Sequence, residues 1–347
     1  MKKVLITGVA GFIGFHLARR MKALGYQITG IDNVNDYYEV SLKWARLAEL
    51  GVEREAAEKT TYITKDGFTF HMLDMADMSS VLSVCKEEKF DAVIHLAAQA
   101  GVRYSLTNPQ AYTHSNIDGF LSVIEGCRQS HVQHFIYAST SSVYGLNTTM
   151  PFSVKKPADH PISLYAATKK ANEMMAHAYS HLYQLPTTGI RFFSVYGPWG
   201  RPDMALFIFT KNILEGKPIQ VYNHGNMQRD FTYVSDIVNG IIHILHQPPQ
   251  VNQNWHEEFD PSTSSAPYKL VNIGNRNPVN LMDFIREIEE NLQKDAIIDY
   301  LPMQPGDVPV NIANVDELVN EYGYRPTVTV AEGVKAFVDW YKTYYRI

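Results

Sequence analysis

A tyrosine and a lysine stand four residues apart in the segment Tyr165-Ala166-Ala167-Thr168-Lys169. On a helix this spacing puts both side chains on one face. A phenol has a reference pKa of about 10, so it removes a proton near neutral pH only where positive charge stabilises the phenolate. Lys169 could supply that charge. Because the chain has 21 tyrosines, chance alone provides about one such pair, and the pair needs supporting neighbours.

Hydroxyl side chains provide that support in the run Ser139-Thr140-Ser141-Ser142, which ends an apolar stretch that predicts a strand over 134–139. Open α/β sheets bind ligands at the carboxyl ends of their strands. Thr140 could there bond the same substrate oxygen as Tyr165 and complete a proton-transfer site. The alternative is an exposed helical Tyr and Lys beside a serine-rich turn.

A glycine-rich turn, Thr7-Gly8-Val9-Ala10-Gly11-Phe12-Ile13-Gly14, follows the first apolar run and leads into an amphipathic helix. Glycines let the backbone approach a pyrophosphate, which the N–H groups of the helix N-terminus then hold. Asp32 follows Gly14 by 18 residues, where a carboxylate accepts hydrogen bonds from an adenosine ribose and repels a 2′-phosphate. No arginine follows Asp32 closely, so the pattern favours NAD over NADP.

Further residues are expected around the cofactor. Asp74 ends a predicted strand and could hold the adenine amine, or could simply cap a helix. His95 is expected to be a buried core histidine, whereas the small residues after it suit backbone that passes beside a cofactor. The predicted cofactor-binding residues are Gly8, Gly11, Phe12, Ile13, Gly14, Asp32, Asn33, Asp74, Leu96, Ala97, Ala98, Tyr165 and Lys169.

The order of predicted elements indicates the fold that positions these residues. Short apolar runs at 4–7, 27–31, 69–73, 92–96, 134–139 and 188–193 alternate with helical patterns. Strands that alternate with helices form βαβ units with right-handed crossovers, so we expect an α/β fold of the Rossmann type with a doubly wound parallel sheet. The charged stretch 42–59, within a long connection at 33–67, predicts an exposed inserted helix whose role is not assigned.

A change of pattern after Tyr196 predicts two domains. We expect an NAD-binding domain over 1–195, to which the chain returns around 231–274, and a smaller α/β substrate-binding domain over most of 196–347. The Pro/Asn-rich stretch 247–267 is expected to be a surface loop.

Composition narrows the class of function. The 347 residues are 45% hydrophobic and carry a net charge of −5, with basic residues scattered, which disfavours a nucleic-acid partner. Cys85 and Cys127 lie outside C-x-x-C and metal-like spacings, so reduced thiols of a cytoplasmic protein and no metal are expected. The N-terminal apolar run is too short for a signal peptide, and no stretch approaches 18 uninterrupted apolar residues, so no membrane association is expected.

The glycine turn, Asp32, the Thr140 region, Tyr165 and Lys169 together resemble the motifs of extended short-chain dehydrogenase/reductases, the NAD-dependent epimerase/dehydratase family. The resemblance covers nearly the whole chain. It implies an enzyme that holds NAD tightly, and a homodimer joined through two helices per subunit, one of them carrying Tyr165.

Four segments, 32–38, 100–105, 200–205 and 304–308, are more narrowly similar to UDP-glucuronate 4-epimerases. That similarity implies a UDP-sugar substrate, and a nucleotide-sugar role for the second domain. Arg229 matches the family's diphosphate arginine, and Arg201 and Asp307 match its nucleotide-side contacts. Each of the three could otherwise be a surface ion-pair residue.

The residues after Thr140 separate related reactions. Related dehydratases usually carry an Asp-Glu pair there, and related UDP-glucuronate decarboxylases show a Glu at the second position, where this chain has Ser142. The missing carboxyl favours oxidation and re-reduction at one carbon. In the predicted mechanism Tyr165 takes the C4 proton while hydride moves to NAD, the 4-keto sugar turns over, and hydride returns to its other face to give UDP-galacturonate.

A 4-keto glucuronate is a β-keto acid, so the site must hold its carboxylate away from the alignment that releases CO₂. The candidate neutral donors are Thr140, Ser141, Ser142 and Ser194, and Arg103 is a charged candidate. We favour the hydroxyls, since Ser194 stands where galactose-type epimerases usually show Asn; a plain strand-end serine is the alternative.

Other functions stay open at this stage. An epimerase of UDP-glucose or its N-acetyl analogue and a UDP-glucuronate decarboxylase are the competing enzymes. A non-catalytic NAD-binding sensor is the alternative from another class, because fold does not fix function. The intact set of Thr140, Tyr165 and Lys169 disfavours the sensor.

Overall fold

The computed structural model describes residues 2–255, 259–304 and 306–347. Pro305 of the 304–308 motif and residues 256–258 of the expected surface loop therefore lie outside the described residues. The described parts of 247–267 carry short turns, the helical residue Trp255 and no strand, in agreement with a largely irregular segment.

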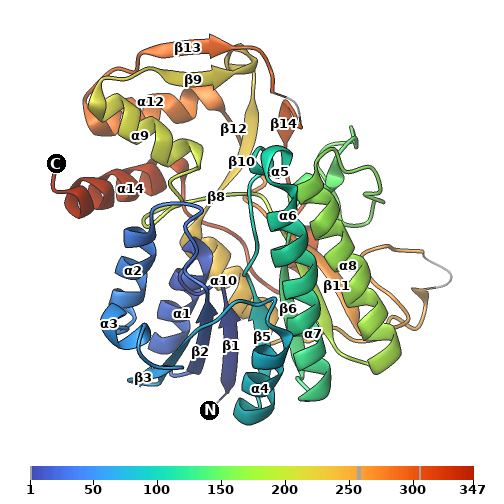
Figure 1. The fold of residues 1–347 in the computed structure, drawn as a ribbon. Helices are drawn as coiled ribbons and strands as arrows, with labels where there is room; N and C mark the ends of the chain where they lie inside the picture. Colours follow the sequence, from blue (N-terminus) through green and yellow to red (C-terminus); the bar gives the residue numbers. More distant parts are fainter. Residues whose placement is uncertain (1, 256–258, 305) are drawn as a thin grey trace.

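A large twisted sheet with strand order β11-β7-β6-β5-β1-β2-β4-β3 forms the centre of the molecule (Figure 1). Its strands are β1 (Lys3–Thr7), β2 (Gln27–Asp32), β3 (Ile63–Lys65), β4 (Phe68–Met72), β5 (Ala92–His95), β6 (His134–Thr140), β7 (Thr187–Phe192) and β11 (Tyr268–Ile273). All pairings are parallel except that of β3 with β4. The predicted Rossmann-type α/β fold is confirmed, and each of the six predicted strands lies within a residue of its expected position.

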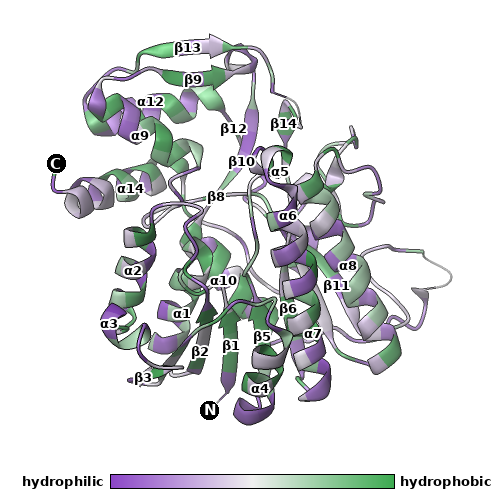
Figure 2. Cartoon of the chain, viewed as in Figure 1, coloured by the Kyte–Doolittle hydropathy of each residue, from purple (hydrophilic) through white to green (hydrophobic). Residues whose placement is uncertain are grey.

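Alternating side chains let the sheet bury both faces. Val4 and Ile6 of β1 join one hydrophobic cluster and Leu5 joins the other, as the period of a strand requires. Figure 2 shows the hydrophobic character of β1 and β5. Near-continuous apolar strands are what a parallel sheet covered on both faces needs.

Helices cover the two faces in two groups (Figure 1). One cluster packs beneath α1 (Phe12–Ala23), α2 (Val40–Glu49), α3 (Arg54–Ala57) and α10 (Val234–Leu245). The other packs beneath α4 (Met78–Glu88), α7 (Gly119–Gln129) and α8 (Leu164–Tyr183). Between β5 and α7 lie the short helices α5 (Tyr104–Thr107) and α6 (Pro109–Tyr112) and the π-helical turn η1 (Thr113–Asp118).

A second group of elements stands above the carboxyl ends of the large sheet (Figure 1). Its strands are β8 (Ser194–Tyr196), β9 (Ile219–Tyr222), β10 (Gln228–Tyr233), β12 (Pro278–Asn280), β13 (Ile298–Leu301) and β14 (Val310–Asn311), and its helices are α9 (Ala205–Glu215), α12 (Leu281–Leu292) and α14 (Val330–Tyr345). All of them except β14 contribute to a third hydrophobic cluster. The chain returns to the large sheet with β11, whereas the division into domains after residue 195 stays a prediction.

The sequence predicted that the inserted helix is exposed, but in the structure one face of it is buried. In α2, Leu42 and Leu47 are buried, and so are the cations Lys43 and Arg46. The charges were misleading because both cations find oxygen partners inside the protein: the Lys43 ammonium donates to Asn35 and the Arg46 guanidinium to backbone carbonyls.

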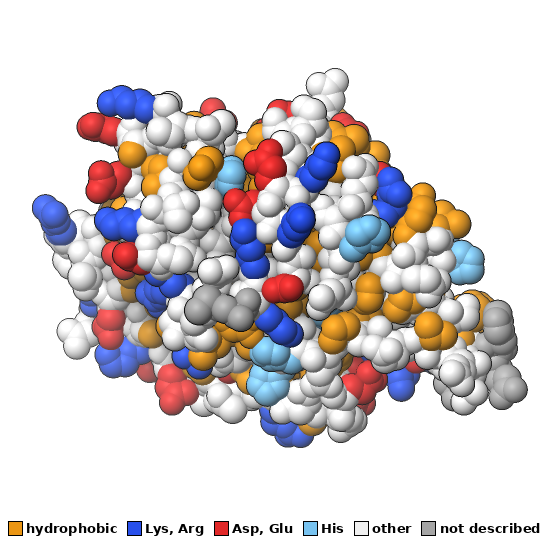
Figure 3. Space-filling model, turned by 90° about the horizontal axis from the view of Figure 1, so that it is seen from below, with side chains coloured by type: hydrophobic (Ala, Val, Ile, Leu, Met, Phe, Trp, Pro, Cys, Tyr) orange, Lys and Arg blue, Asp and Glu red, His pale blue; other side chains and the backbone are white. Residues whose placement is uncertain are grey.

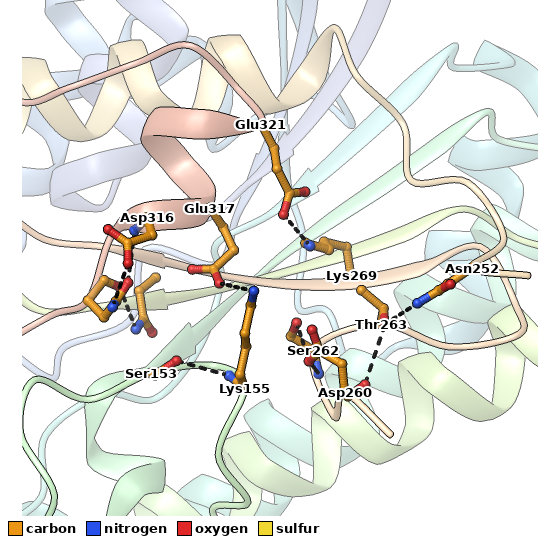
Figure 4. Close-up of polar contacts among 12 residues, drawn as sticks. Ser153, Lys155, Asn252, Asp260, Ser262, Thr263, Lys269, Asp316, Glu317 and Glu321 are labelled. Atoms are coloured by element: carbon orange, nitrogen blue, oxygen red, sulfur yellow. Dashed lines mark hydrogen bonds and ion pairs between the residues drawn. The ribbon is translucent and has the colours of Figure 1, made fainter. Parts of the chain in front are cut away.

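Positively and negatively charged side chains are mixed on the surface that the figures show. The face seen from below in Figure 3 mixes basic, acidic and histidine side chains. Near the β11 edge, the exposed Glu321 pairs with the buried Lys269 at 2.8 Å, and the exposed Lys155 approaches the buried Glu317 at 3.9 Å (Figure 4). Within the described ranges, no helix has the length and apolar character needed to cross a bilayer.

Candidate active site

A cavity of about 1080 Å³ lies at the carboxyl ends of the central strands, beneath the second group of elements. Here β1 has β2 on one side and β5 on the other, so the connections diverge, which is where doubly wound sheets bind ligands. Every residue that the sequence predicted as catalytic, cofactor-binding or substrate-binding lines this cavity. The fold thus brings together residues from 8 to 307; their individual roles stay predictions.

The glycine turn leaves no room for side chains. A Cβ on Gly8 would lie 2.8 Å from the Ala97 backbone nitrogen, and one on Gly14 would lie 2.2 Å from the Gly8 carbonyl oxygen. Gly8 also has φ +73°, a conformation that favours glycine. The turn can therefore approach β5 closely and lead directly into α1 at Phe12.

Asp32 closes β2 beside that turn. Its carboxylate accepts hydrogen bonds from the Ala10 nitrogen at 3.0 Å and the Val34 nitrogen at 2.8 Å. Burial raises the pKa of Asp32, while the nearby Lys43 charge lowers it. A carboxylate has lone pairs for further donors, so Asp32 can still accept from a ribose.

Asp74 does not cap the following helix, because the N-cap of α4 is Asp77, which accepts from the Ser80 nitrogen. The Asp74 carboxylate instead accepts from Asn33 Nδ2 at 3.1 Å and lies 3.4 Å from His114 Nε2. Although partial burial raises the pKa of Asp74, hydrogen bonds from Ala76, Asn33 and His114 bring it below its usual value. The helix-cap alternative is therefore wrong, and the adenine role stays a prediction.

Helix α8 presents the tyrosine and lysine to the cavity. Its N-cap is Ser163, whose hydroxyl accepts from the Ala166 nitrogen, so Tyr165 lies in the first turn. Burial raises the pKa of Tyr165, whereas the Arg201 charge and a hydrogen bond with Thr140 lower it. A phenol bonded to a threonine hydroxyl beside a cation is an arrangement suited to proton transfer.

Lys169 lies one turn further on and is 1% exposed. Burial lowers the pKa of Lys169 to about 8, opposed by the negative charge of Glu173. Its Nζ has no hydrogen-bond partner among the described residues. A buried ammonium without a partner needs an acceptor, and the ribose hydroxyls of a nicotinamide nucleotide are such acceptors. With the glycine turn and Asp32, this orphan donor makes the cavity fit NAD.

Asn116, in η1, fixes α8 against the end of β5. Its amide donates to Thr168 Oγ1 and to the Gln99 carbonyl, both at 3.0 Å, and accepts from the Gln99 nitrogen at 2.8 Å. Asn172 in turn donates to the Asn116 carbonyl at 2.6 Å. The sequence carries no motif that marks Asn116, because it lies within an ordinary helical pattern.

His95 is a core histidine, as predicted. It is 1% exposed, its Nδ1 lies 2.8 Å from Thr7 Oγ1, and burial lowers its pKa to about 3. It is therefore neutral at physiological pH.

Hydroxyls, rather than carboxyls, follow Thr140. Thr140 Oγ1 donates to Ser142 Oγ at 3.3 Å, and Ser141 Oγ accepts from Asn311 Nδ2 at 2.9 Å. Ser194 begins β8 and also faces the cavity. The acidic residues among the described lining are Asp32, Asp74, Asp203 and Asp307.

Two arginines in the cavity are paired with aspartates. Arg229 Nη2 lies 3.3 Å from Asp307 Oδ1, and burial lowers the pKa of Arg229. Arg201 Nε donates to Asp203 Oδ1 at 3.0 Å. These ion pairs line a cavity and not the outer surface. Because the Arg201 charge acts on the Tyr165 phenol, Arg201 lies near the proposed reaction centre as well as on the nucleotide side that the resemblance implies.

Arg103 contacts an aromatic ring across the cavity. Its guanidinium lies 4.6 Å from the centre of the Tyr222 ring on β9, within reach of a cation–π interaction. It is exposed, unlike the buried Thr140 and Ser141. Arg103 is thus engaged with β9 rather than with the hydroxyl cluster.

Sequence reasoning missed several lining residues: Lys43, Tyr37, Asp203, Tyr222, Gln304 and Asn311. Tyr37, Asp203 and Gln304 lie within the segments 32–38, 200–205 and 304–308 that carried the narrower resemblance, and Lys43 had a separate signal. It lies between Leu42 and Leu47 with Arg46 three residues on, so both cations fall on or beside the apolar face of an amphipathic helix. Lys43 also modifies the cofactor argument, since a cation does lie near Asp32 although no arginine follows it closely.

Comparisons with known proteins agree with this arrangement. Residues 4–256 match the model of the NAD dependent epimerase/dehydratase family. The chain is 52% identical over 345 residues to Protein CapI of Staphylococcus aureus, with 99% of each chain covered. It is 44% identical over 346 residues to a probable UDP-glucuronate 4-epimerase of Rhizobium meliloti (strain 1021), covering 99% of this chain and 98% of that one.

A solved structure is similar over the same length. The UDP-glucuronic acid 4-epimerase of Bacillus cereus, in complex with UDP-glucuronic acid and NAD, matches with a TM-score of 0.83 and 30% identity. The match covers 99% of this chain and 100% of that chain. The similarity therefore includes both the large sheet and the elements above it.

Proposed function

This chain belongs to the NAD-dependent epimerase/dehydratase family, and on that premise we propose that it is a UDP-glucuronate 4-epimerase, which interconverts UDP-glucuronate and UDP-galacturonate. The family resemblance predicted from the motifs is confirmed, and NAD is its cofactor. The observation that carries the proposal is the meeting of Thr140, Tyr165 and Lys169 in one cavity with hydroxyls, and no carboxyl, after Thr140.

The chain's own residues perform the proton transfer in this proposal. Tyr165 removes the proton of the C4 hydroxyl, and Thr140 bonds the same oxygen. The Lys169 ammonium stabilises the phenolate and bonds the nicotinamide ribose. Bound NAD supplies a reversible acceptor for the C4 hydride. Tyr165 then returns the proton to the oxygen after the 4-keto sugar has presented its other face, which inverts C4.

The diphosphate provides the pivot for that rotation. The Arg229 side chain is 16% exposed and lines the cavity, so its cation can hold a diphosphate. Asp307, which pairs with Arg229, is a carboxylate acceptor suited to a uridine ribose. With the diphosphate held at Arg229, the sugar can turn about the diphosphate linkage while the nucleotide stays bound.

Ser141, Ser142 and Ser194 are the residues proposed to hold the sugar carboxylate. Neutral donors can bond a carboxylate without supplying the proton that an elimination requires. Asn311 bonds Ser141 at 2.9 Å and thereby orients that hydroxyl. Restraining the carboxylate out of alignment with the C4 carbonyl suppresses loss of CO₂.

The test is incubation of the purified protein with UDP-glucuronate, without added cofactor, followed by NMR. Appearance of UDP-galacturonate supports the proposal. UDP-xylose or a 4-keto pentose as the main product indicates a decarboxylase. Turnover of UDP-glucose or UDP-N-acetylglucosamine but not of UDP-glucuronate indicates a neutral-sugar epimerase.

Assembly and location are part of the same proposal. Helix α8 exposes Met174, Ala178 and Leu182 at intervals of four residues, so they form one apolar stripe. That stripe supports a homodimer that packs through α8. The buried free thiols Cys85 and Cys127 support a reducing, cytoplasmic location.

A further inference from the structure

The side chain of Arg46, on the inserted helix α2, is fully buried between two loops of the cavity. Its Nη1 donates to the Ala10 carbonyl at 2.8 Å. Its Nη2 donates to the Trp199 carbonyl at 2.7 Å and to the Gly200 carbonyl at 3.1 Å. One guanidinium therefore joins two segments almost 190 residues apart in the chain.

The segment at Ala10 and the segment at Trp199 and Gly200 belong to different parts of the site. Ala10 belongs to the glycine turn, where the backbone must meet the cofactor pyrophosphate. Trp199 and Gly200 come immediately before Arg201, whose charge acts on the Tyr165 phenol. Arg46 therefore holds the loop that carries Arg201 in a fixed position relative to the glycine turn.

The geometry of the guanidinium suits this role. Its planar fork directs several N–H groups to separate acceptors, whereas an ammonium acts as a single point. Arg46 also donates to the Tyr38 hydroxyl at 2.7 Å, which fixes the guanidinium from a third side. Burying a cation is unfavourable unless it is hydrogen-bonded and near opposite charge, and Asp32 is the carboxylate that feels the Arg46 charge.

Other contacts of this loop come from α1 on one side and from α14 on the other, where Trp199 packs against Trp340 and Tyr344 with centroids 5.3 and 5.2 Å apart. His16, on α1, lies with Nε2 2.8 Å from the Pro198 carbonyl oxygen. The Phe15 ring packs against Trp199 with centroids 5.4 Å apart. Trp199 itself has φ +60°, a left-handed conformation that a tryptophan adopts only when its surroundings impose it. Trp199 is thus held in a strained conformation by contacts from α1, α2 and α14.

From these contacts we propose that Arg46 is a positioning residue that couples the cofactor site at the glycine turn to the nucleotide-sugar site beside Arg201. Binding of the cofactor orders the glycine turn, and the hydrogen bonds of Arg46 then restrict the motion of the loop that carries Arg201. The inserted helix α2 supplies the coupling. This inference rests on the proposed function for its second ligand, a nucleoside diphosphate sugar. Because coupling is reciprocal, a diphosphate nucleotide at the Arg201 side should also strengthen retention of NAD.

The first test needs no turnover. Hydrogen exchange of the backbone amides of 197–203 is measured by mass spectrometry in NAD-loaded and NAD-stripped protein. In the wild type, NAD is expected to slow exchange in this segment about tenfold. In Arg46→Met the slowing should vanish, and Arg54→Met, on the exposed end of the insertion, should behave as wild type. Equal slowing in Arg46→Met and wild type would overturn the inference.

The second test measures binding of UDP by calorimetry to the same two forms. We expect NAD to tighten UDP binding to the wild type by a factor in the range of about 5–150, and this factor should fall to about one in Arg46→Met. Arg46→Lys keeps the charge and the stem but not the fork, so it should also lose most of the coupling. Full coupling in Arg46→Lys would show that charge alone suffices and would contradict the proposal.

A double-mutant cycle tests the route of the coupling. If Arg46 acts through the Arg201 loop, Arg46→Met should change the UDP dissociation constant less than about twofold when Arg201→Met is already present. Fully additive effects would refute that route. Failure of the wild type to epimerise UDP-glucuronate would refute the proposed function alone, since neither the exchange nor the UDP measurement depends on turnover.

Discussion

Arg191 on β7 and Glu173 on α8 form a bidentate ion pair inside the protein, with both N–O distances 2.8 Å. Ser139 Oγ donates to the same carboxylate at 2.7 Å. Both charged side chains are 2% exposed or less. The pair lies one helical turn beyond Lys169 and ties the helix that carries Tyr165 to the central sheet.

Replacing Arg191 by Met should therefore destabilise the fold strongly. Loss of Arg191 leaves the buried Glu173 charge with only the Ser139 hydroxyl and the Lys170 ammonium, 3.4 Å away, and breaking a buried pair costs about 3–5 kcal/mol of unfolding free energy. Urea denaturation measures the change. As a control, Arg276→Met breaks an exposed pair with Asp316 and should cost less than about 1 kcal/mol. Similar losses in the two variants would show that the buried pair does not hold α8.

Replacing Tyr165 by Phe should abolish most epimerase activity while NAD stays bound. The ring remains, but the proton acceptor is gone, and such groups contribute about 10²–10⁴-fold. Conversion of UDP-glucuronate is followed by NMR, and the cofactor content by absorbance after denaturation. Tyr183→Phe, at the exposed end of the same helix, should be fully active. An active Tyr165→Phe enzyme would remove the phenol from the mechanism.

Lys169 should make the cofactor-free protein less stable at neutral pH than at alkaline pH, relative to Lys169→Met. Its pKa is about 8 in the folded protein and near 10.5 in the unfolded chain, so between these values the unfolded state binds more protons. The unfolding free energy then rises with pH across that window, by about 3 kcal/mol in total.

The comparison is made by denaturation of both proteins at pH 7, 8, 9 and 10, because thiols and phenols common to both cancel in the difference. Lys169→Met should be the more stable protein at pH 7 and lose that advantage as pH approaches 10. A difference that does not vary with pH would mean that burial leaves the Lys169 ammonium unperturbed.

Ser141→Ala and Ser142→Ala should divert part of the substrate into decarboxylation. With a donor removed, the carboxylate of the 4-keto sugar turns more freely into alignment with the carbonyl. We expect the ratio of 4-keto pentose to UDP-galacturonate, measured by NMR, to rise at least about tenfold, the equivalent of about 1.4 kcal/mol. Ser83→Ala, on the outer face of α4, should leave the ratio unchanged. An unchanged ratio in both active-site variants would assign the carboxylate to other residues.

Charges placed on the α8 stripe should separate the proposed dimer. Met174→Arg combined with Leu182→Arg puts two cations where two apolar side chains are 52% and 66% exposed in the single chain. Light scattering after size exclusion should report a dimer for the wild type and a monomer for the double variant. Leu24→Arg, an exposed apolar position at the end of α1, should stay dimeric. Dimerisation of the double variant would move the interface elsewhere.

Local pattern was sufficient to predict the fold and residues that line the cavity around the glycine turn. Each predicted strand is a short apolar run between turn residues. The glycines at 8 and 14 indicate a tight turn by themselves, because a Cβ at either position would collide with backbone. Strand β3 was missed because it has only three residues, two of them exposed, and pairs antiparallel at the edge of the sheet.

Contacts between distant segments were beyond local pattern. Nothing near Tyr37 in the sequence indicates that its hydroxyl reaches Asp203, 3.2 Å away, or that Asn311 bonds Ser141. The burial of Arg46 was missed for a related reason. A charged residue in a charged stretch is expected to be exposed to solvent, and its burial is possible only because carbonyls of two remote loops accept its hydrogen bonds. Such partners depend on the tertiary fold, which the sequence specifies only as a whole.

Trp199 packs between Phe15, on α1, and Trp340, on α14, with ring centroids 5.4 and 5.3 Å apart. During synthesis Phe15 leaves the ribosome more than 300 residues before Trp340, which at typical rates is roughly 20–60 seconds. Over that interval a nascent chain can build the first strands and helices but cannot complete the packing around the Arg201 loop. The growing polypeptide should therefore fold the first strands and helices of the large sheet early and close the cavity only near the end of translation.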